Sequence, residues 1–225
     1  MVLRIGHRGA PAYEPENTLR SFQKALQLGA DMIECDVHLC RTGELVVIHD
    51  TSVRRTTNGR GRISGLSQKE LATLDAGKGE HVPTLAEVIE LVNKKIPINI
   101  ELKSDNSGKA VALLLTQYIA KGWNPEHFIV SSFMYRELRI FVSHMPSVRV
   151  GILGEVVRKK MLSVADALHA YSLHLHYPHI TREVVENLHA RGYQVFVWTV
   201  DGPEDIARMK QMGVDGIYSN AIDRI

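Results

Sequence analysis

Two carboxylate residues separated by one position, Glu34 and Asp36, are the residues of this sequence best suited to chemistry. Alternate residues of a β-strand point to the same face, so a strand here would present both side chains together. Paired buried carboxylates are costly unless a cation lies between them, and Mg²⁺ or Ca²⁺ binds oxygen ligands of this kind. Histidines, which titrate near neutral pH, precede and follow the pair at His7 and His49. These residues predict a metal-dependent hydrolase with histidine proton donors and acceptors.

The elements that must position these residues follow a regular alternation of short apolar runs and helix-period segments. The expected strands are residues 2–7, 32–36, 97–103, 128–132, 148–153, 172–176, 194–200 and 214–219. The expected helices are residues 18–28, 84–92, 109–121, 135–144, 159–169, 181–190 and 203–212. Eight strands with helices between them predict an α/β fold, a (β/α)8 TIM barrel. A doubly wound sheet is the alternative, but no Gly-x-Gly-x-x-Gly motif follows the first strand.

Helix boundaries have clear local signals. Thr84 and Glu87 form a capping-box pattern at the start of one helix. Glycines follow four of the helical segments, where a left-handed residue would end the helix; they are Gly29, Gly122, Gly192 and Gly213.

One interval of the chain is longer than a strand–helix repeat requires. Residues 37–49 predict a β-hairpin after the second strand, and residues 50–82 predict a small insertion rich in Gly, Arg, Thr and Ser. We expect a single domain over residues 1–225, with the insertion at the carboxyl end of the barrel strands, where barrel active sites lie.

The candidate functional residues lie at the ends of the expected strands. His7 and Arg8 end the first strand, and Glu34 and Asp36 end the second. The remaining strand-end candidates are Glu101, Lys103 and Trp198. Because the carboxyl ends of barrel strands meet at one end of the barrel, we expect these side chains to lie together, with His49 returning to them from the hairpin.

Each group of residues predicts a role. Glu34, Asp36 and Glu101 offer three anionic oxygen ligands to a single divalent cation, and no Cys/His spacing favours zinc. Arg8 and Lys103 would bind phosphate oxygens, or alternatively would only pair with the carboxylates. The imidazoles of His7 and His49 would serve as general acid and base, in an order that the sequence leaves open.

Composition excludes several classes of protein. The net charge is only +2, which argues against a nucleic-acid partner, although four arginines cluster in residues 54–62. Two cysteines, Cys35 and Cys40, are too few for a disulfide framework and favour reduced packing residues. No apolar stretch is long enough for a membrane span and no signal peptide is visible, so we expect a cytoplasmic protein.

The motifs together resemble the glycerophosphodiester phosphodiesterase family, and they follow its order along essentially the whole chain. They are His7-Arg8-Gly9, Pro15-Glu16-Asn17-Thr18, Glu34-Cys35-Asp36, His49-Asp50, Arg55-Thr56-Thr57-Asn58-Gly59-x-Gly61, Leu74-Asp75-Ala76-Gly77, Val82-Pro83-Thr84-Leu85, Glu101-x-Lys103 and Trp198-Thr199-Val200.

The resemblance implies hydrolysis of glycerophosphodiesters to glycerol 3-phosphate and an alcohol such as choline or ethanolamine. It implies metal ligands at Glu34, Asp36 and Glu101, one divalent cation (Mg²⁺ or Ca²⁺), and catalytic histidines at His7 and His49. It further implies phosphate contacts by Arg8 and Lys103, and Trp198 at the pocket rim against the glycerol carbons. Trp198 as a packing residue is the alternative.

Other features leave alternatives open. Relatives often end the last strand with Ser-Asp-x-Pro-Asp, whereas this chain has Ser219-Asn220-Ala221-Ile222-Asp223, a difference that we expect to affect the pocket wall rather than the metal ligands. Asn17 is a candidate cap of the first helix, and His174 and His176 either line the pocket or pack beside it. A phosphodiesterase that stops at a cyclic phosphate and a non-catalytic phosphate-binding barrel are the alternative functions.

Overall fold

The computed structural model describes residues 1–225 and places nine strands in one sheet. Eight of these strands are parallel and close into a barrel, because β1 pairs with both β2 and β9. The barrel strands are β1 (Leu3–Gly6), β2 (Met32–Leu39), β4 (Ile98–Leu102), β5 (Phe128–Ser132), β6 (Arg149–Gly154), β7 (Ser172–His176), β8 (Gln194–Trp198) and β9 (Gly216–Ser219). The predicted TIM barrel is confirmed.

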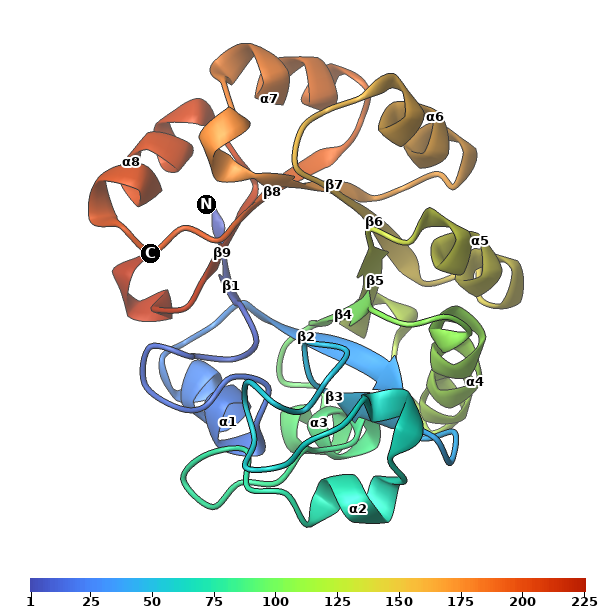
Figure 1. The fold of residues 1–225 in the computed structure, drawn as a ribbon. Helices are drawn as coiled ribbons and strands as arrows, with labels where there is room; N and C mark the ends of the chain where they lie inside the picture. Colours follow the sequence, from blue (N-terminus) through green and yellow to red (C-terminus); the bar gives the residue numbers. More distant parts are fainter.

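Helices surround the barrel as an outer ring (Figure 1). They are α1 (Leu19–Gln27), α3 (Leu85–Val92), α4 (Ser107–Ala120), α5 (Tyr135–His144), α6 (Lys159–Ala167), α7 (Arg182–Ala190) and α8 (Pro203–Met212). Short 3₁₀ turns lie at 125–127, 177–179 and 222–224. No helix is both long enough and apolar enough to span a membrane.

The predicted helix signals are present. Thr84 and Glu87 make both hydrogen bonds of a capping box at the start of α3. All four predicted stop glycines have positive φ, between 77° and 85°. Helix α4 begins two residues earlier than expected, at Ser107, because Gly108 permits close packing on α5. A Cβ on Gly108 would lie 2.3 Å from the carbonyl oxygen of Glu137.

Side chains alternate along β2 between two different environments. Ile33, Cys35 and Val37 belong to a core of 47 buried residues that includes residues of the strands and the surrounding helices. Met32 belongs to a separate cluster of five buried residues, together with Ile5, Ile129, Phe196 and Tyr218. Glu34 and Asp36 share the face of Met32, so the pleat of β2 turns both carboxylates into the barrel.

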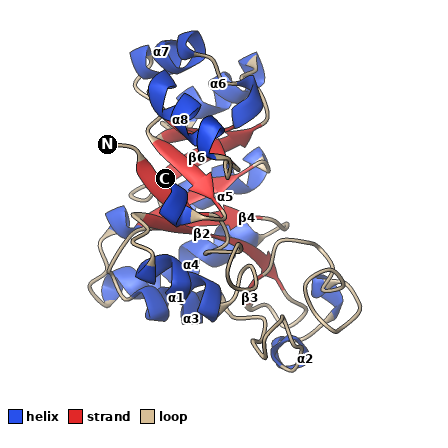
Figure 2. Ribbon diagram, turned by 90° about the vertical axis from the view of Figure 1, so that its left-hand side faces the viewer, coloured by secondary structure: helices blue, strands red, loops and turns tan.

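The segment after β2 forms the predicted hairpin and the predicted small insertion. Strand β3 (Leu45–Val47) runs antiparallel to β2, and the chain continues through a 3₁₀ turn (Ile63–Gly65) and α2 (Gln68–Ala72). Figure 2 shows α2 and its loops standing beyond β3, outside the ring of helices. Eight buried residues form a small core here, among them Val46, Ile63 and Leu71. The burial of these side chains fixes the insertion against the hairpin.

Candidate active site

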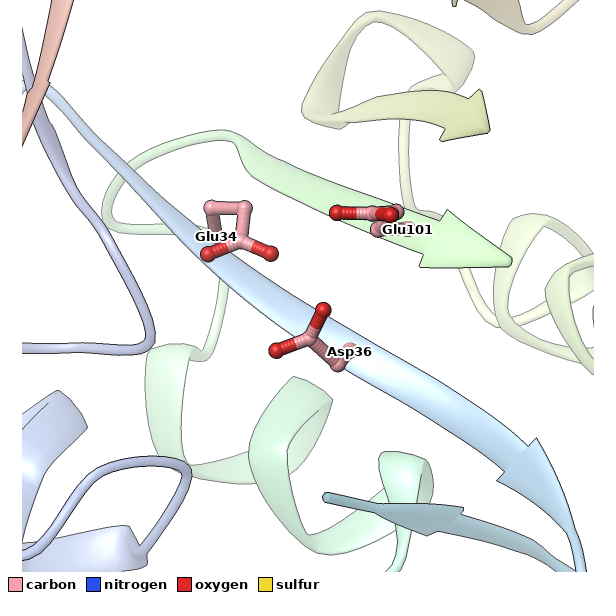
Figure 3. A group of neighbouring side chains, drawn as sticks. All are labelled: Glu34, Asp36 and Glu101. Carbon is pink, nitrogen blue, oxygen red and sulfur yellow. The ribbon is translucent and has the colours of Figure 1, made fainter. Parts of the chain in front are cut away.

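Three carboxylates converge inside the barrel mouth. Glu34 and Asp36 project from β2, and Glu101 projects from the neighbouring β4, where its Cα is paired with that of Asp36 (Figure 3). One oxygen of each lies within 4.8 Å of the others. Glu34 and Asp36 are buried, and Glu101 is half-buried. The strand register therefore brings together the three residues that the sequence predicted as metal ligands.

The electrostatics of this cluster fit a bound cation. Burial, followed by the charges of Asp36 and Glu101, raises the pKa of Glu34 well above its usual value. Burial and Asp36 likewise raise the pKa of Glu101 to about 7. Glu34 Oε1 is buried without any hydrogen-bond partner. A divalent cation would satisfy this oxygen and would favour the ionised form of all three carboxylates.

Two cationic side chains lie beside the carboxylates. Lys103 Nζ is 2.8 Å from Glu101 Oε1 and 3.4 Å from Asp36 Oδ1. Arg8 Nε is 3.3 Å from Asp36 Oδ2, and Arg8 Nη1 is 2.9 Å from Glu16 Oε1. Burial opposes ionisation of Asp36, but Lys103 and Arg8 hold its pKa below the usual value. Both cations also line a cavity at the barrel mouth, so they can pair with the carboxylates and still face a ligand bound there.

Asn17 contacts Asp36 and does not cap the first helix, the role suggested by its position in the sequence. Its amide Nδ2 donates to Asp36 Oδ2 at 2.9 Å, and its Oδ1 accepts from the backbone N–H of Asp36 at 3.3 Å. The cap of α1 is instead Thr18, whose side chain accepts from the N–H of Ser21. Asn17 has a φ of 57°, a left-handed conformation that asparagine tolerates. Asn17 therefore orients a carboxylate of the cluster.

His7 lies directly after β1 and contacts the end of β9. Its Nδ1 is 2.9 Å from Asn220 Oδ1 and 3.4 Å from Thr199 Oγ1. Burial, together with the charge of Arg8, lowers the pKa of His7 to about 4. Position 220 therefore contacts a residue of the pocket wall rather than a metal ligand, and Asn220 is the hydrogen-bond partner of His7.

His49 lies at one end of a chain of hydrogen-bonded side chains that was not predicted from the sequence. Its Nδ1 is 2.7 Å from Asp50 Oδ1, and both Asp50 oxygens accept from Arg55 at 2.7 and 2.9 Å. Arg55 also donates to both oxygens of Glu16 at 2.8 Å, and Glu16 contacts Arg8. The motifs that contain His49, Arg55 and Glu16 were visible in the sequence, but the contacts that join them were not. Arg55 of the insertion is thus connected to Asp36 of the carboxylate cluster through Glu16 and Arg8.

One cavity lies at the barrel mouth, and Glu34 and Glu101 of the carboxylate cluster line it. The cavity walls include His7, His49, Arg8 and Lys103, and Trp198 lies beside the half-exposed Phe133, with ring centroids 5.8 Å apart. Trp198 therefore lines the cavity, as expected. Asn99 and Tyr218, which were not predicted, also line it, as does His174, for which lining the pocket was one of the two alternatives.

His174 and His176 have different positions. His176 stacks on Trp198, with centroids 4.8 Å apart, and is not a cavity-lining residue. His174 is fully buried; its Nε2 is 2.7 Å from Ser172 Oγ, and its Nδ1 is 2.9 Å from Tyr218 Oη. It packs against Gly151, where a Cβ would lie 2.4 Å from Nε2. Only glycine leaves room for the ring in this position.

Stability should fall in acid because of His174. Burial lowers its pKa from 6.5 to about 3, so between these values the unfolded chain binds the additional proton. The free energy of unfolding should decrease as pH falls through this window, by about 3–5 kcal/mol in total from this residue. Urea denaturation from pH 7 to pH 3 should show a weaker pH dependence for His174→Gln than for the wild type. The exposed His179→Gln is the control; equal slopes for all three proteins would contradict the assignment.

Comparisons with known proteins agree with this architecture. The model of the Glycerophosphoryl diester phosphodiesterase family matches residues 7–224. A glycerophosphodiester phosphodiesterase of Caldanaerobacter subterraneus subsp. tengcongensis is 40% identical over 97% of this chain and 94% of its own length.

Solved structures give the same result. A phosphodiesterase from Oleispira antarctica, in complex with the product sn-glycerol-3-phosphate, has a TM-score of 0.91 at 28% identity, covering 98% of this chain and 94% of its own. The glycerophosphodiester phosphodiesterase from Thermotoga maritima has a TM-score of 0.81 at 29% identity, covering 99% and 96%. The resemblance inferred from the motifs is confirmed, and the protein belongs to the glycerophosphodiester phosphodiesterase family of enzymes.

Proposed function

We propose that this enzyme hydrolyses glycerophosphodiesters, such as glycerophosphocholine and glycerophosphoethanolamine, to sn-glycerol 3-phosphate and the free alcohol. One observation carries the proposal: two histidines, two cations and two carboxylates line a single cavity, and the third carboxylate, Asp36, lies directly beside them. The family membership of the chain and the product bound to the Oleispira antarctica enzyme support the same substrate class.

Glu34, Asp36 and Glu101 would hold one divalent cation, for which Mg²⁺ and Ca²⁺ are the candidates. When bound, the cation polarises a phosphoryl oxygen and stabilises the charge that develops in the transition state. Asn17 keeps the Asp36 carboxylate in its orientation through two hydrogen bonds. We assign the metal centre to these residues.

Arg8 and Lys103 would bind the non-bridging oxygens of the phosphodiester from the wall of the cavity. Trp198 would pack on the carbon atoms of the glycerol group. His7 and His49 would exchange protons, one with the attacking water and the other with the leaving alcohol. Each histidine has a hydrogen-bond partner on Nδ1, which leaves Nε2 for the reaction.

The free thiols of Cys35 and Cys40 are both buried, and they support our further proposal of a reducing, cytoplasmic location. We also propose that residues 1–225 act as a single catalytic domain.

The test is release of glycerol 3-phosphate from glycerophosphocholine by the purified protein with Mg²⁺, Mn²⁺ or Ca²⁺. We expect turnover that EDTA abolishes and added metal restores. Phosphorus NMR of the product should show the monoester; accumulation of a cyclic phosphate would identify a lyase. If the protein binds glycerophosphocholine but does not hydrolyse it with any of the three metals, it is a non-catalytic phosphate-binding barrel.

A further inference from the structure

Asn220 is held in one orientation by Asp201. The Asn220 Nδ2 amide donates to Asp201 Oδ2 at 2.7 Å, and the Asn220 backbone N–H donates to Asp201 Oδ1 at 2.7 Å. Ser219 Oγ also donates to Asp201 Oδ1, at 2.8 Å. An ionised carboxylate only accepts hydrogen bonds, so the NH₂ end of the Asn220 amide must face Asp201.

This orientation determines which proton His7 carries. With its NH₂ group on Asp201, Asn220 presents Oδ1 to His7 Nδ1 at 2.9 Å. An amide oxygen accepts but does not donate, so His7 Nδ1 must carry a hydrogen. A neutral imidazole protonated on Nδ1 has its lone pair on Nε2, the nitrogen that can take a proton.

We propose that Asn220, clamped by Asp201, is a positioning residue that holds the hydrogen of the His7 ring on Nδ1 and leaves Nε2 to accept a proton, which makes His7 the general base. The base role of His7 rests on the proposed function, because it presupposes the hydrolysis. The position of the hydrogen on Nδ1 follows from the hydrogen bonds alone. The neutral amide is essential to it, because a carboxylate in direct contact would instead favour the imidazolium form.

The contrast with His49 assigns the other role. His49 Nδ1 contacts a carboxylate, Asp50, rather than an amide. Arg55 pairs with Asp50 through two hydrogen bonds, which fixes the carboxylate against the imidazole. An ionised carboxylate only accepts hydrogen bonds, so His49 donates from Nδ1 to Asp50; with the base role on His7, His49 is left with the general-acid role. The two different Nδ1 partners thus divide the acid and base roles.

The charged groups around His7 agree with a neutral ring. Arg8 adds to burial in disfavouring the imidazolium, whereas Asp36, Glu16 and the hydrogen bond to Asn220 oppose this effect. Thr199, at the end of β8, is neutral, and Asp201 reaches His7 only through Asn220. The net effect is a pKa of about 4, so His7 is unprotonated at neutral pH.

The first test needs no activity. In protein with ¹⁵N-labelled histidine, the ring nitrogens of His7, identified by their loss in His7→Gln, should report a neutral ring with hydrogen on Nδ1 at pH 7. A ring protonated on Nε2, or on both nitrogens, would overturn the proposal. Because this measurement requires no turnover, it separates failure of the inference from failure of the proposed hydrolysis.

The second test exchanges the two partners in Asp201→Asn/Asn220→Asp. The exchange preserves net charge and the hydrogen-bonding atoms but brings the carboxylate into contact with His7. We expect the acidic limb of the kcat/KM profile, and the NMR titration of His7, to move up by ~1–2 pH units. Asn124→Asp, an exposed position before β5 at the other end of the barrel, should leave both unchanged. A shift of the alkaline limb instead, or no shift in a folded variant, would refute the assignment.

Discussion

A Glu34→Gln variant is expected to lose on the order of 10³-fold in kcat/KM for glycerophosphocholine, even with excess divalent metal. Glu34 Oε1 is buried and has no protein hydrogen-bond partner, so the cation is the group that would satisfy it. Glutamine has the same shape but no charge. Titration calorimetry with Mn²⁺ should show a large loss of affinity, which separates a lost metal from a damaged fold.

The same substitution should not destabilise the metal-free protein. Burial and the neighbouring Asp36 and Glu101 raise the pKa of Glu34, so the metal-free site already favours a neutral side chain. The free energy of unfolding of metal-free Glu34→Gln should therefore equal or exceed that of the wild type. Asn17→Ala is the graded control: it removes a group that orients Asp36, and we expect metal affinity to fall only ~10–100-fold. Unchanged Mn²⁺ affinity in Glu34→Gln would remove this residue from the ligand set.

The barrel and most of the candidate site could be predicted because their signals are local. Alternation along β2 predicts that Glu34 and Asp36 point to one face of the strand and Cys35 to the other. Cys35 packs in the core shared by the strands and the surrounding helices, as this alternation predicts. Parallel strands also bring their carboxyl ends together, which placed Glu101 opposite Asp36 without any long-range information.

The missed residues depend on closure of the barrel. His7 and Asn220 are 213 positions apart, and their contact exists only because β9 returns to pair with β1. Asn99 and Tyr218 meet across the barrel interior, 119 positions apart, for the same reason. No local pattern encodes such pairs.

Helix α2 is a different case, because Ser67 and Glu70 form a capping box that was available in the sequence. Five residues are too short for a clear helical period, so the surrounding glycines and serines concealed the helix. Its Leu71 is nevertheless a buried member of the small core of the insertion.

Closure of the barrel also explains how two similar histidines obtain different chemistry. His7 receives its amide partner from the last strand, whereas His49 receives a carboxylate from its own neighbour in the chain. The insertion then stabilises this carboxylate through Arg55. The two rings face one cavity, but their Nδ1 partners come from independent parts of the fold.

Replacement of His49 by glutamine should lower kcat by ~10²–10⁴-fold for glycerophosphocholine, because choline alkoxide is a poor leaving group that needs a proton from the general acid. A substrate with a p-nitrophenyl group in place of choline releases p-nitrophenolate, which needs no proton. His49→Gln should therefore recover most of the wild-type rate on the p-nitrophenyl ester of glycerol phosphate. Parallel assays on the two substrates measure this recovery.

His7→Gln is the matched control, because it should remain impaired by ~10²–10⁴-fold on both substrates. Activation of water is needed whatever the leaving group, and the base role of His7 follows from its contact with Asn220. Recovery of His7→Gln on the p-nitrophenyl ester, with His49→Gln remaining impaired, would reverse the two roles. Near-wild-type activity of either variant on glycerophosphocholine would exclude that histidine from proton transfer.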